Sequence, residues 1–150
     1  MGRDFYARDS LEVARDLIGR LVIRTTGGRR LAGRIVEAEA YARDDPASHA
    51  FRGPTPRNAS MFGPAGHAYV YRSHGIHSCM NVTTGDGSAV LLRALEPVRG
   101  MGEMIRRRGL DEVRLLCAGP GRLCQALDIS LAEDGHDLTA GRRLWLARGK

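Results

Sequence analysis

The stretch Arg34-Ile-Val-Glu-Ala-Glu-Ala-Tyr41 decides the fold of the region around it. Its apolar and polar residues alternate, which is the pattern of a β-strand whose two faces meet different surroundings. The alternation predicts an apolar and a polar face, made of Val36, Ala38 and Ala40 on one side and Glu37, Glu39 and Tyr41 on the other. Two carboxylates on one strand face repel each other if both are buried and ionised. The polar face is therefore either solvated or holds a general base beside an aromatic wall.

The residues before this stretch predict a hairpin in which it forms the second arm. Residues 21–23 form the first strand, residues 25–28 the turn and residues 31–41 the return strand. Further upstream, Asp9-Ser-Leu-Glu12 has the pattern of a capping box and opens a short helix, which ends at Gly19. The apolar stripe predicted for that helix consists of Leu11, Ala14, Leu17 and Ile18.

The residues after this stretch begin with a proline-rich loop over residues 42–66, and loops of such length inside a domain are often functional. Strands are predicted at residues 68–71 and 78–82, flanking a tip at residues 73–76, and again at 89–95 and 143–146. Helical patterns occupy residues 101–108, 112–117 and 122–127. Strands that come first and helices that follow favour an α+β fold.

Length and composition set limits on the class of protein. A chain of 150 residues fits one domain, since domains usually have ~100–200 residues. There is no apolar run of the ~18 residues that a membrane span needs, and the N-terminus does not resemble a signal peptide, so we expect a cytoplasmic protein. The three cysteines lack the spacing of a zinc knuckle, and we expect buried thiols.

The charge favours a polyanionic partner. The net charge is +6, and Lys150 is the only lysine, so nearly all the cations are arginines. The planar guanidinium fits phosphate groups and stacks on rings, which suits nucleic acid.

Several polar residues gather in the middle of the chain, and each also has an ordinary explanation. Tyr69 and Tyr71 could be half-buried strand residues, and His49 could be a solvated or capping histidine. Asn81 and Arg93 are harder to explain in this way, because an amide or guanidinium inside a strand needs partners. The whole set consists of Glu39, Tyr41, His49, Tyr69, Tyr71, His74, His77, Asn81 and Arg93.

The chain closely resembles the alkyladenine (3-methyladenine) DNA glycosylase family, in ordered blocks that extend nearly from Leu11 to the end. The matching blocks are Arg34–Tyr41, Ser48-His49, Thr55–Asn58, Met61-Phe62, Tyr69–Tyr71, Cys79–Asn81, Val90–Pro97, Gly119-Pro120 and Leu123–Leu127. The resemblance implies a monofunctional enzyme that removes alkylated or deaminated purines, such as 3-methyladenine and hypoxanthine, without a metal or cofactor. It also implies a single α+β domain over residues 1–150, with a curved antiparallel sheet, flanking helices and a protruding hairpin that enters the minor groove.

The resemblance assigns roles to residues by position. Glu39 corresponds to the general base that activates the attacking water, and Arg93 to the residue that helps to hold this water. The pocket for the flipped base corresponds to Tyr41, His49 and Tyr71, with Asn81 crowding normal guanine. Contacts with the DNA backbone and groove correspond to Arg52, Thr55 and Met61, and the wedge to His74, Gly75, Ile76 and His77.

At one position the chain departs from the family pattern. The family carries a wedging tyrosine where this chain has His74, so our hypothesis is a weaker wedge or one that Ile76 shares. Family members also continue past residues 143–146, and we expect the shorter C-terminus to affect one side of the pocket.

The chemistry of these residues agrees with the implied reaction. Cleavage of an N-glycosidic bond builds positive charge on the sugar, which a carboxylate stabilises while it takes a proton from water. Aromatic faces offset part of the cost of unstacking a base, and a cationic alkylated purine gains a cation–π contribution. A strand-cutting lyase usually needs an amine, and Lys150 is the only lysine, so we expect no lyase activity.

The expected partner is double-stranded DNA with damaged purines. We expect a monomer with no obligatory protein partner and no membrane contact, associated with the nucleoid of a prokaryotic cell. One alternative is a non-catalytic nucleic-acid-binding domain of the same fold. A metal-dependent hydrolase is less favoured, since the spacing of its candidate ligands matches no known scheme; these are Glu37, Glu39, Asp44, Asp45 and His49.

Overall fold

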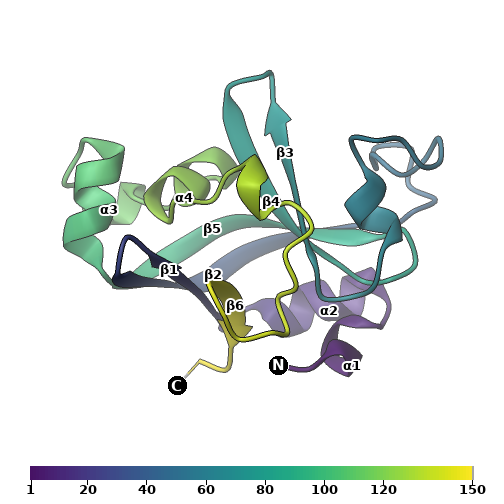
Figure 1. Cartoon of the computed structure of the whole chain (residues 1–150), viewed down its shortest axis with the longest axis horizontal. Coiled ribbons are helices and arrows are strands. Elements are labelled where there is room, and N and C mark those ends of the chain that lie inside the picture. Colours follow the sequence, from purple (N-terminus) through teal and green to yellow (C-terminus); the bar gives the residue numbers. More distant parts are fainter. Residues whose placement is uncertain (150) are drawn as a thin grey trace.

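The computed structural model describes residues 1–149, and its main element is a curled antiparallel sheet (Figure 1). Within these residues the sheet has six strands in the order β3-β4-β5-β2-β1-β6. The strands are β1 (Leu21–Thr26), β2 (Arg29–Tyr41), β3 (Ala68–Ser73), β4 (His77–Thr83), β5 (Ala89–Arg99) and β6 (Leu144–Ala147). The hairpin of β3 and β4 projects from the body of the molecule (Figure 1). The predicted α+β fold with a curved sheet and a protruding hairpin is confirmed.

The helices are short and lie between or beside the strands. They are α1 (Arg3–Tyr6), α2 (Ser10–Leu17), α3 (Met101–Arg108) and α4 (Pro120–Ala126), with 3-10 turns η1 (Ala59–Phe62), η2 (Val113–Leu115) and η3 (Leu131–Glu133). The helix predicted at residues 112–117 is wrong, because only η2 forms there. The next helix, α4, begins with Pro120, where the missing N–H of proline costs nothing.

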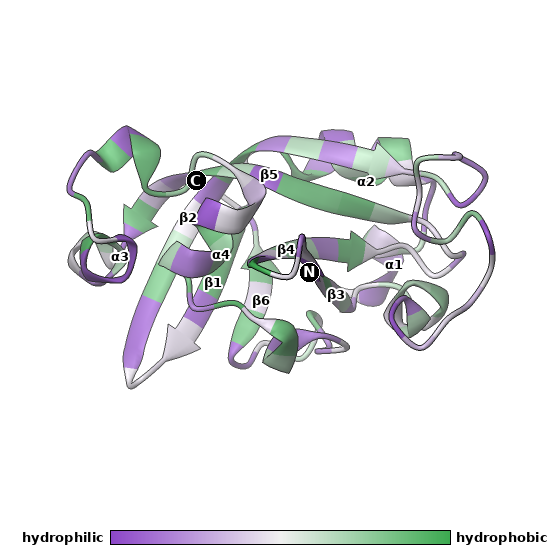
Figure 2. Ribbon diagram, turned by 90° about the horizontal axis from the view of Figure 1, so that it is seen from above, coloured by the Kyte–Doolittle hydropathy of each residue, from purple (hydrophilic) through white to green (hydrophobic). Residues whose placement is uncertain are grey.

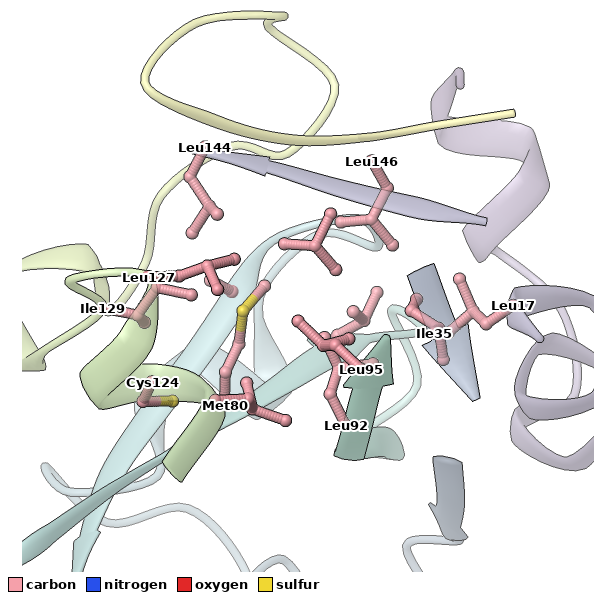
Figure 3. Packing of buried hydrophobic residues seen from close by; sticks show 14 of the residues in the cluster. Leu17, Ile35, Met80, Leu92, Leu95, Cys124, Leu127, Ile129, Leu144 and Leu146 are labelled. Atoms are coloured by element: carbon pink, nitrogen blue, oxygen red, sulfur yellow. The ribbon is translucent and has the colours of Figure 1, made fainter. Parts of the chain in front are cut away.

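The main core lies on one face of the sheet and receives side chains from α2 and α4. Met80 of β4 and Leu92 of β5 are fully buried there, and Leu17 of α2 and Leu127, which directly follows α4, lie in the same core (Figure 3). β5 is the most apolar of the central strands, as its colour in Figure 2 indicates, and its residues 89–95 are nearly all buried. This strand therefore anchors the sheet to the core.

The apolar stripe of α2 differs from the prediction. Ser10, Val13, Ala14 and Leu17 are buried, whereas Leu11 and Ile18 are about half exposed. Ile18 follows the helix in an extended conformation, so the helical period no longer determines its direction. The Asp9 side chain makes no capping hydrogen bond, so the predicted capping box does not form.

Two bulges change the direction of side chains in the middle of β2 and β5. Ile35 pairs with Leu95 and Ala38 with Leu92, but the register shifts between these pairs, which leaves Val36 and Arg93 without a direct partner in the ladder. A bulge inserts an extra residue and restarts the alternation of side chains. Ile35 and Ala38 thus both face the main core, although three positions separate them. The prediction that Val36 shares the face of Ala38 is wrong, because Val36 is half exposed.

Within residues 1–149, no helix has the length and apolar character that crossing a membrane would require.

Candidate active site

The polar residues of the sheet gather on the face opposite the main core. Val70, Met80 and Leu92 point into that core, so their neighbours along each strand point the other way. The ladder register aligns one side chain from each of four adjacent strands, in the order Tyr69, Asn81, Leu91 and Glu39. Glu39 and Leu91, which are 52 positions apart in the sequence, are therefore neighbours in a single row.

A second, smaller apolar cluster holds the loop between β2 and β3 against this face. Ala50 and Met61 from the loop pack on Tyr69 and Ala89 of the sheet, with Phe62 and Tyr71 at the margin. Under the loop lies a cavity of ≈ 60 Å³ lined by Tyr41, Ala47, His49, Met61, Tyr69, Tyr71 and Asn81. The structure thus brings together the four residues predicted to surround a base, namely Tyr41, His49, Tyr71 and Asn81.

Glu39 accepts a hydrogen bond and faces a cation at the edge of this cavity. The Tyr41 hydroxyl donates to Oε1 of Glu39, and this bond is the main cause that raises the pKa of Tyr41. Nη1 of Arg93 lies 3.7 Å from the same oxygen. Both the Glu39 and Arg93 side chains are about half exposed, so water reaches the pair. Arg93 is the bulged residue of β5, and the bulge directs its guanidinium toward Glu39.

His49 closes the aromatic part of the cavity. Its Nδ1 lies 2.9 Å from the Tyr69 hydroxyl. The centroids of the His49 and Tyr71 rings are 4.4 Å apart, and the angle between the ring planes is 67°. Burial lowers the pKa of His49, and nearby Arg57 adds to this, so the neutral imidazole is favoured. A base stacked between two rings separates them by roughly 7 Å, twice the ~3.4 Å spacing of stacked bases. The cavity therefore cannot take a base between His49 and Tyr71 until His49 withdraws.

The tyrosines and Asn81 form an uncharged wall. Burial raises the pKa of Tyr69 to about 12 and that of Tyr71 well above its ordinary value. Asn81 is buried, and its Nδ2 donates to the carbonyl oxygen of Tyr69 at 3.2 Å. Buried Cys79 stands beside Tyr71, and burial raises the pKa of its thiol, so it is a packing residue rather than a nucleophile.

A larger groove of ≈ 380 Å³ adjoins the cavity, since His49 and Tyr69 line both. Its lining includes Arg52 and Arg57 and no carboxylate, and Thr55 is also exposed there. These positions suit contacts with phosphate groups.

Met61 does not lie with these exposed residues, although the sequence groups it with Arg52 and Thr55. It is buried in the wall of the cavity, and a contact with DNA would require the loop to open.

The candidate wedge occupies the end of the protruding hairpin. His74 and Gly75 adopt positive φ angles of 52° and 70°, which turn the chain between the paired residues Ser73 and His77. His74, Gly75 and His77 are exposed, and Ile76 is the most exposed large apolar residue of the described chain, at 70%. The tip therefore presents an apolar side chain, Ile76, beside the imidazole of His74.

Two residues that shape the site received no role in the sequence analysis. Tyr69 lines the cavity and bonds to His49, although a plain strand position explained it equally well. Asn58 belongs to a block that resembles the family, but only the structure reveals its bonds within the loop.

As for metals, no three His, Cys, Asp or Glu side chains come together around a possible ion anywhere in residues 1–149. The candidate ligands of the alternative metal-dependent hydrolase therefore form no such group among these residues.

Comparisons with known proteins place the chain among relatives. The model of a family described as methylpurine-DNA glycosylase matches residues 4–150. A protein from Agrobacterium fabrum is 57% identical over 138 residues, one from Carboxydothermus hydrogenoformans 51% over 151 residues, and one from Rhodopseudomonas palustris 55% over 141 residues. Each of the three carries the name "Putative 3-methyladenine DNA glycosylase". The matches cover 92%, 99% and 92% of this chain, and 69%, 79% and 66% of the relatives.

Proposed function

Because the chain belongs to the methylpurine-DNA glycosylase family, we propose that it excises 3-methyladenine and related damaged purines from double-stranded DNA. The observation that carries the proposal is the position of Glu39, paired with Arg93 at the edge of a cavity walled by aromatic rings. A carboxylate at that place can activate water beside a sugar whose base lies among the rings.

In the proposed reaction the oxygen of a water molecule attacks C1′ of the damaged nucleotide. The N-glycosidic bond breaks, its electron pair leaves with the base, and Glu39 accepts a proton from the water. Tyr41 and Arg93 both engage Oε1 of Glu39, so Oε2 is the oxygen available to the water. Arg93 also lies close enough to Glu39 to hold the water between them.

The cavity would hold the base after the nucleotide has left the duplex. The rings of Tyr41 and Tyr71 offer π faces to a cationic purine, and neutral His49 does not repel its charge. Asn81 is fixed by its bond to the backbone, so it would crowd the extra amino group of guanine. Hypoxanthine lacks this group and is uncharged, and we propose it as a second substrate that relies on shape and on protonation of the leaving base.

The test is excision from defined duplexes. Duplexes with a single 3-methyladenine or hypoxanthine are incubated with the protein, and abasic sites are then cleaved with alkali. Product that forms only from damaged duplexes supports the proposal. If the wild-type protein, with Glu39 present, binds the duplexes but gives no product, the alternative of a non-catalytic DNA-binding domain is supported.

The charge of His49 predicts a pH effect that depends on the lesion. As pH falls through the lowered pKa of His49, the imidazole gains a proton and repels a cationic base. Binding of a cationic 3-methyladenine duplex should therefore weaken relative to a hypoxanthine duplex between about pH 8 and pH 5. Fluorescence anisotropy with the Glu39→Gln variant measures this ratio without turnover. A ratio that is independent of pH would contradict the role of His49, and His49→Gln should remove the dependence.

The exposed tip of the hairpin predicts a defect in flipping. Ile76→Ala removes most of the apolar wedge, so we expect affinity for lesion DNA to fall by roughly 5- to 10-fold, whereas His74→Ala has a smaller effect. Fluorescence of an adenine analogue next to the lesion reports the flipped fraction. Leu11→Ala, which truncates a half-exposed side chain of α2, is the control. A larger effect at His74 than at Ile76 would show that imidazole is the wedge.

A further inference from the structure

Asn58 is 3% exposed and uses its side chain within the loop that covers the cavity. Its Oδ1 accepts from the backbone N–H of Thr55 at 2.6 Å, and its Nδ2 donates to the carbonyl oxygens of His49 at 2.7 Å and Gly53 at 3.2 Å. In return, the backbone N–H of Asn58 donates to Oγ1 of Thr55 at 3.3 Å. One amide therefore joins three positions of the loop.

The direction of these bonds is unusual for the place of Asn58 in the chain. Asn58 precedes η1, and an asparagine there usually caps the following turn. Its side chain makes no capping bond and points back into the preceding segment instead. The cost of leaving η1 uncapped indicates that the shape of residues 49–58 matters more than this turn.

The segment that Asn58 closes carries the side chains that face the cavity and the groove. His49 begins it, and Arg52 and Thr55 lie within it. The backbone carbonyl of His49 is fixed by Asn58, while its ring is fixed by the Tyr69 hydroxyl. These two contacts together determine where the imidazole stands relative to Tyr71.

We propose that Asn58 is a positioning residue that sets the place of His49 over the base pocket by holding the backbone of residues 49–58 in one shape. The proposal rests on the proposed function, because it assigns His49 to the pocket for the base. Asn58 itself touches neither the base nor the water, and its effect on excision passes through the loop.

The decisive variant is Asn58→Ala, studied by the imidazole NMR signal of His49 in the protein without DNA. Without the amide the loop loosens and His49 becomes more hydrated, so its pKa should rise toward the ordinary value. A displacement of about 1 Å in a positioning group can lower enzyme efficiency by up to ~10²-fold. We therefore expect the Kd for a hypoxanthine duplex to rise roughly 10-fold. The rate constant of excision at saturating enzyme should fall by a smaller factor. An unchanged His49 titration together with a Kd within about twofold of wild type would overturn the proposal.

Two further variants separate positioning from general loss of stability. Asn58→Asp keeps the acceptor for Thr55 but places a carboxylate against the carbonyl oxygens of His49 and Gly53, so its defect should be at least that of Asn58→Ala. Asn58→Asp behaving as wild type would refute the role of the two donated bonds. Thr26→Ala, which loses a bond to Asp128 far along the sequence, should leave the His49 titration unchanged.

The failure of this proposal differs from a failure of the proposed function. Thr55→Val removes the hydrogen bond that Oγ1 of Thr55 accepts from the backbone N–H of Asn58, so it should shift the His49 titration partially. This variant provides a second readout if Asn58→Ala does not fold. The titrations require no catalysis, so they decide the role of Asn58 even if the wild-type protein proves unable to excise a base. Absence of excision by wild type would refute the proposed function.

Discussion

Replacing Glu39 with Gln is expected to lower the rate constant of excision by about 10²–10⁴-fold, the usual contribution of a general base. The amide has nearly the shape of the carboxylate but cannot take a proton from water or balance positive charge on the sugar. The Tyr41 hydroxyl can still donate to the amide oxygen, so the pocket should remain assembled. Single-turnover kinetics on a hypoxanthine duplex measure the rate constant, and anisotropy should give a Kd close to that of wild type.

Glu37→Gln is the matched control for this experiment. Glu37 is exposed and lies on the same strand, two residues before Glu39, and it has no side-chain partner among the described residues. It should excise at the wild-type rate. Equal losses in both variants would mean that the effect comes from the charge of the strand, and an active Glu39→Gln variant would refute the assignment of the base.

Replacing Glu133 with Gln is expected to destabilise the fold by about 3–5 kcal/mol, the typical cost of breaking a buried ion pair. Oε1 of Glu133 lies 2.6 Å from Nη2 of Arg24, and both side chains are buried. Arg24 also donates to the carbonyl oxygens of Asp128 and Arg143, which hold its side chain in the interior. In the variant its buried positive charge would lose the carboxylate that lies nearest to it. For a domain of this size the midpoint of thermal unfolding should fall by roughly 6–20 °C.

Glu112→Gln provides a comparison for Glu133→Gln. Glu112 pairs with Arg114 at 3.4 Å, but both side chains are exposed, and such pairs contribute little. Its removal should change stability by less than about 1 kcal/mol. Calorimetry of the two variants measures the difference directly. If they proved equally stable, the Arg24–Glu133 pair would not be an organising contact of β1 and η3.

Periodicity was sufficient to predict much of the fold, but not its local irregularities. Alternation located β2, an apolar run located β5, and a helical pattern predicted α3 with its observed bounds. Arginines fill the last turn of α3, and Gly109 follows it. The bulge at Val36 was not predictable, because alternation from Ala38 backwards assigns Val36 to the core just as well. Only the pairing with β5 determines which residue is extra.

The composition of the candidate site was more predictable than its state. The resemblance selected Tyr41, His49, Tyr71 and Asn81, and the structure gathers all four around one cavity. The resemblance could not indicate that Met61 lies in the wall of the cavity, because the sequence of a loop does not show whether a methionine in it is buried or exposed. The contacts of Asn58 depend on loop geometry, which sequence spacing does not specify.

The 4.4 Å approach of His49 to Tyr71 has a consequence for how damage is found. On the proposed function, a nucleotide that leaves the intact helix only briefly would find no space between the His49 and Tyr71 rings, because His49 must first withdraw. Apparent affinity for any base is reduced by the fraction of molecules that stand open. On the proposed mechanism, a loosely stacked, damaged purine remains outside the helix long enough to meet a molecule in which His49 has withdrawn. The lifetime of the extrahelical base therefore contributes to selection before any bond is broken.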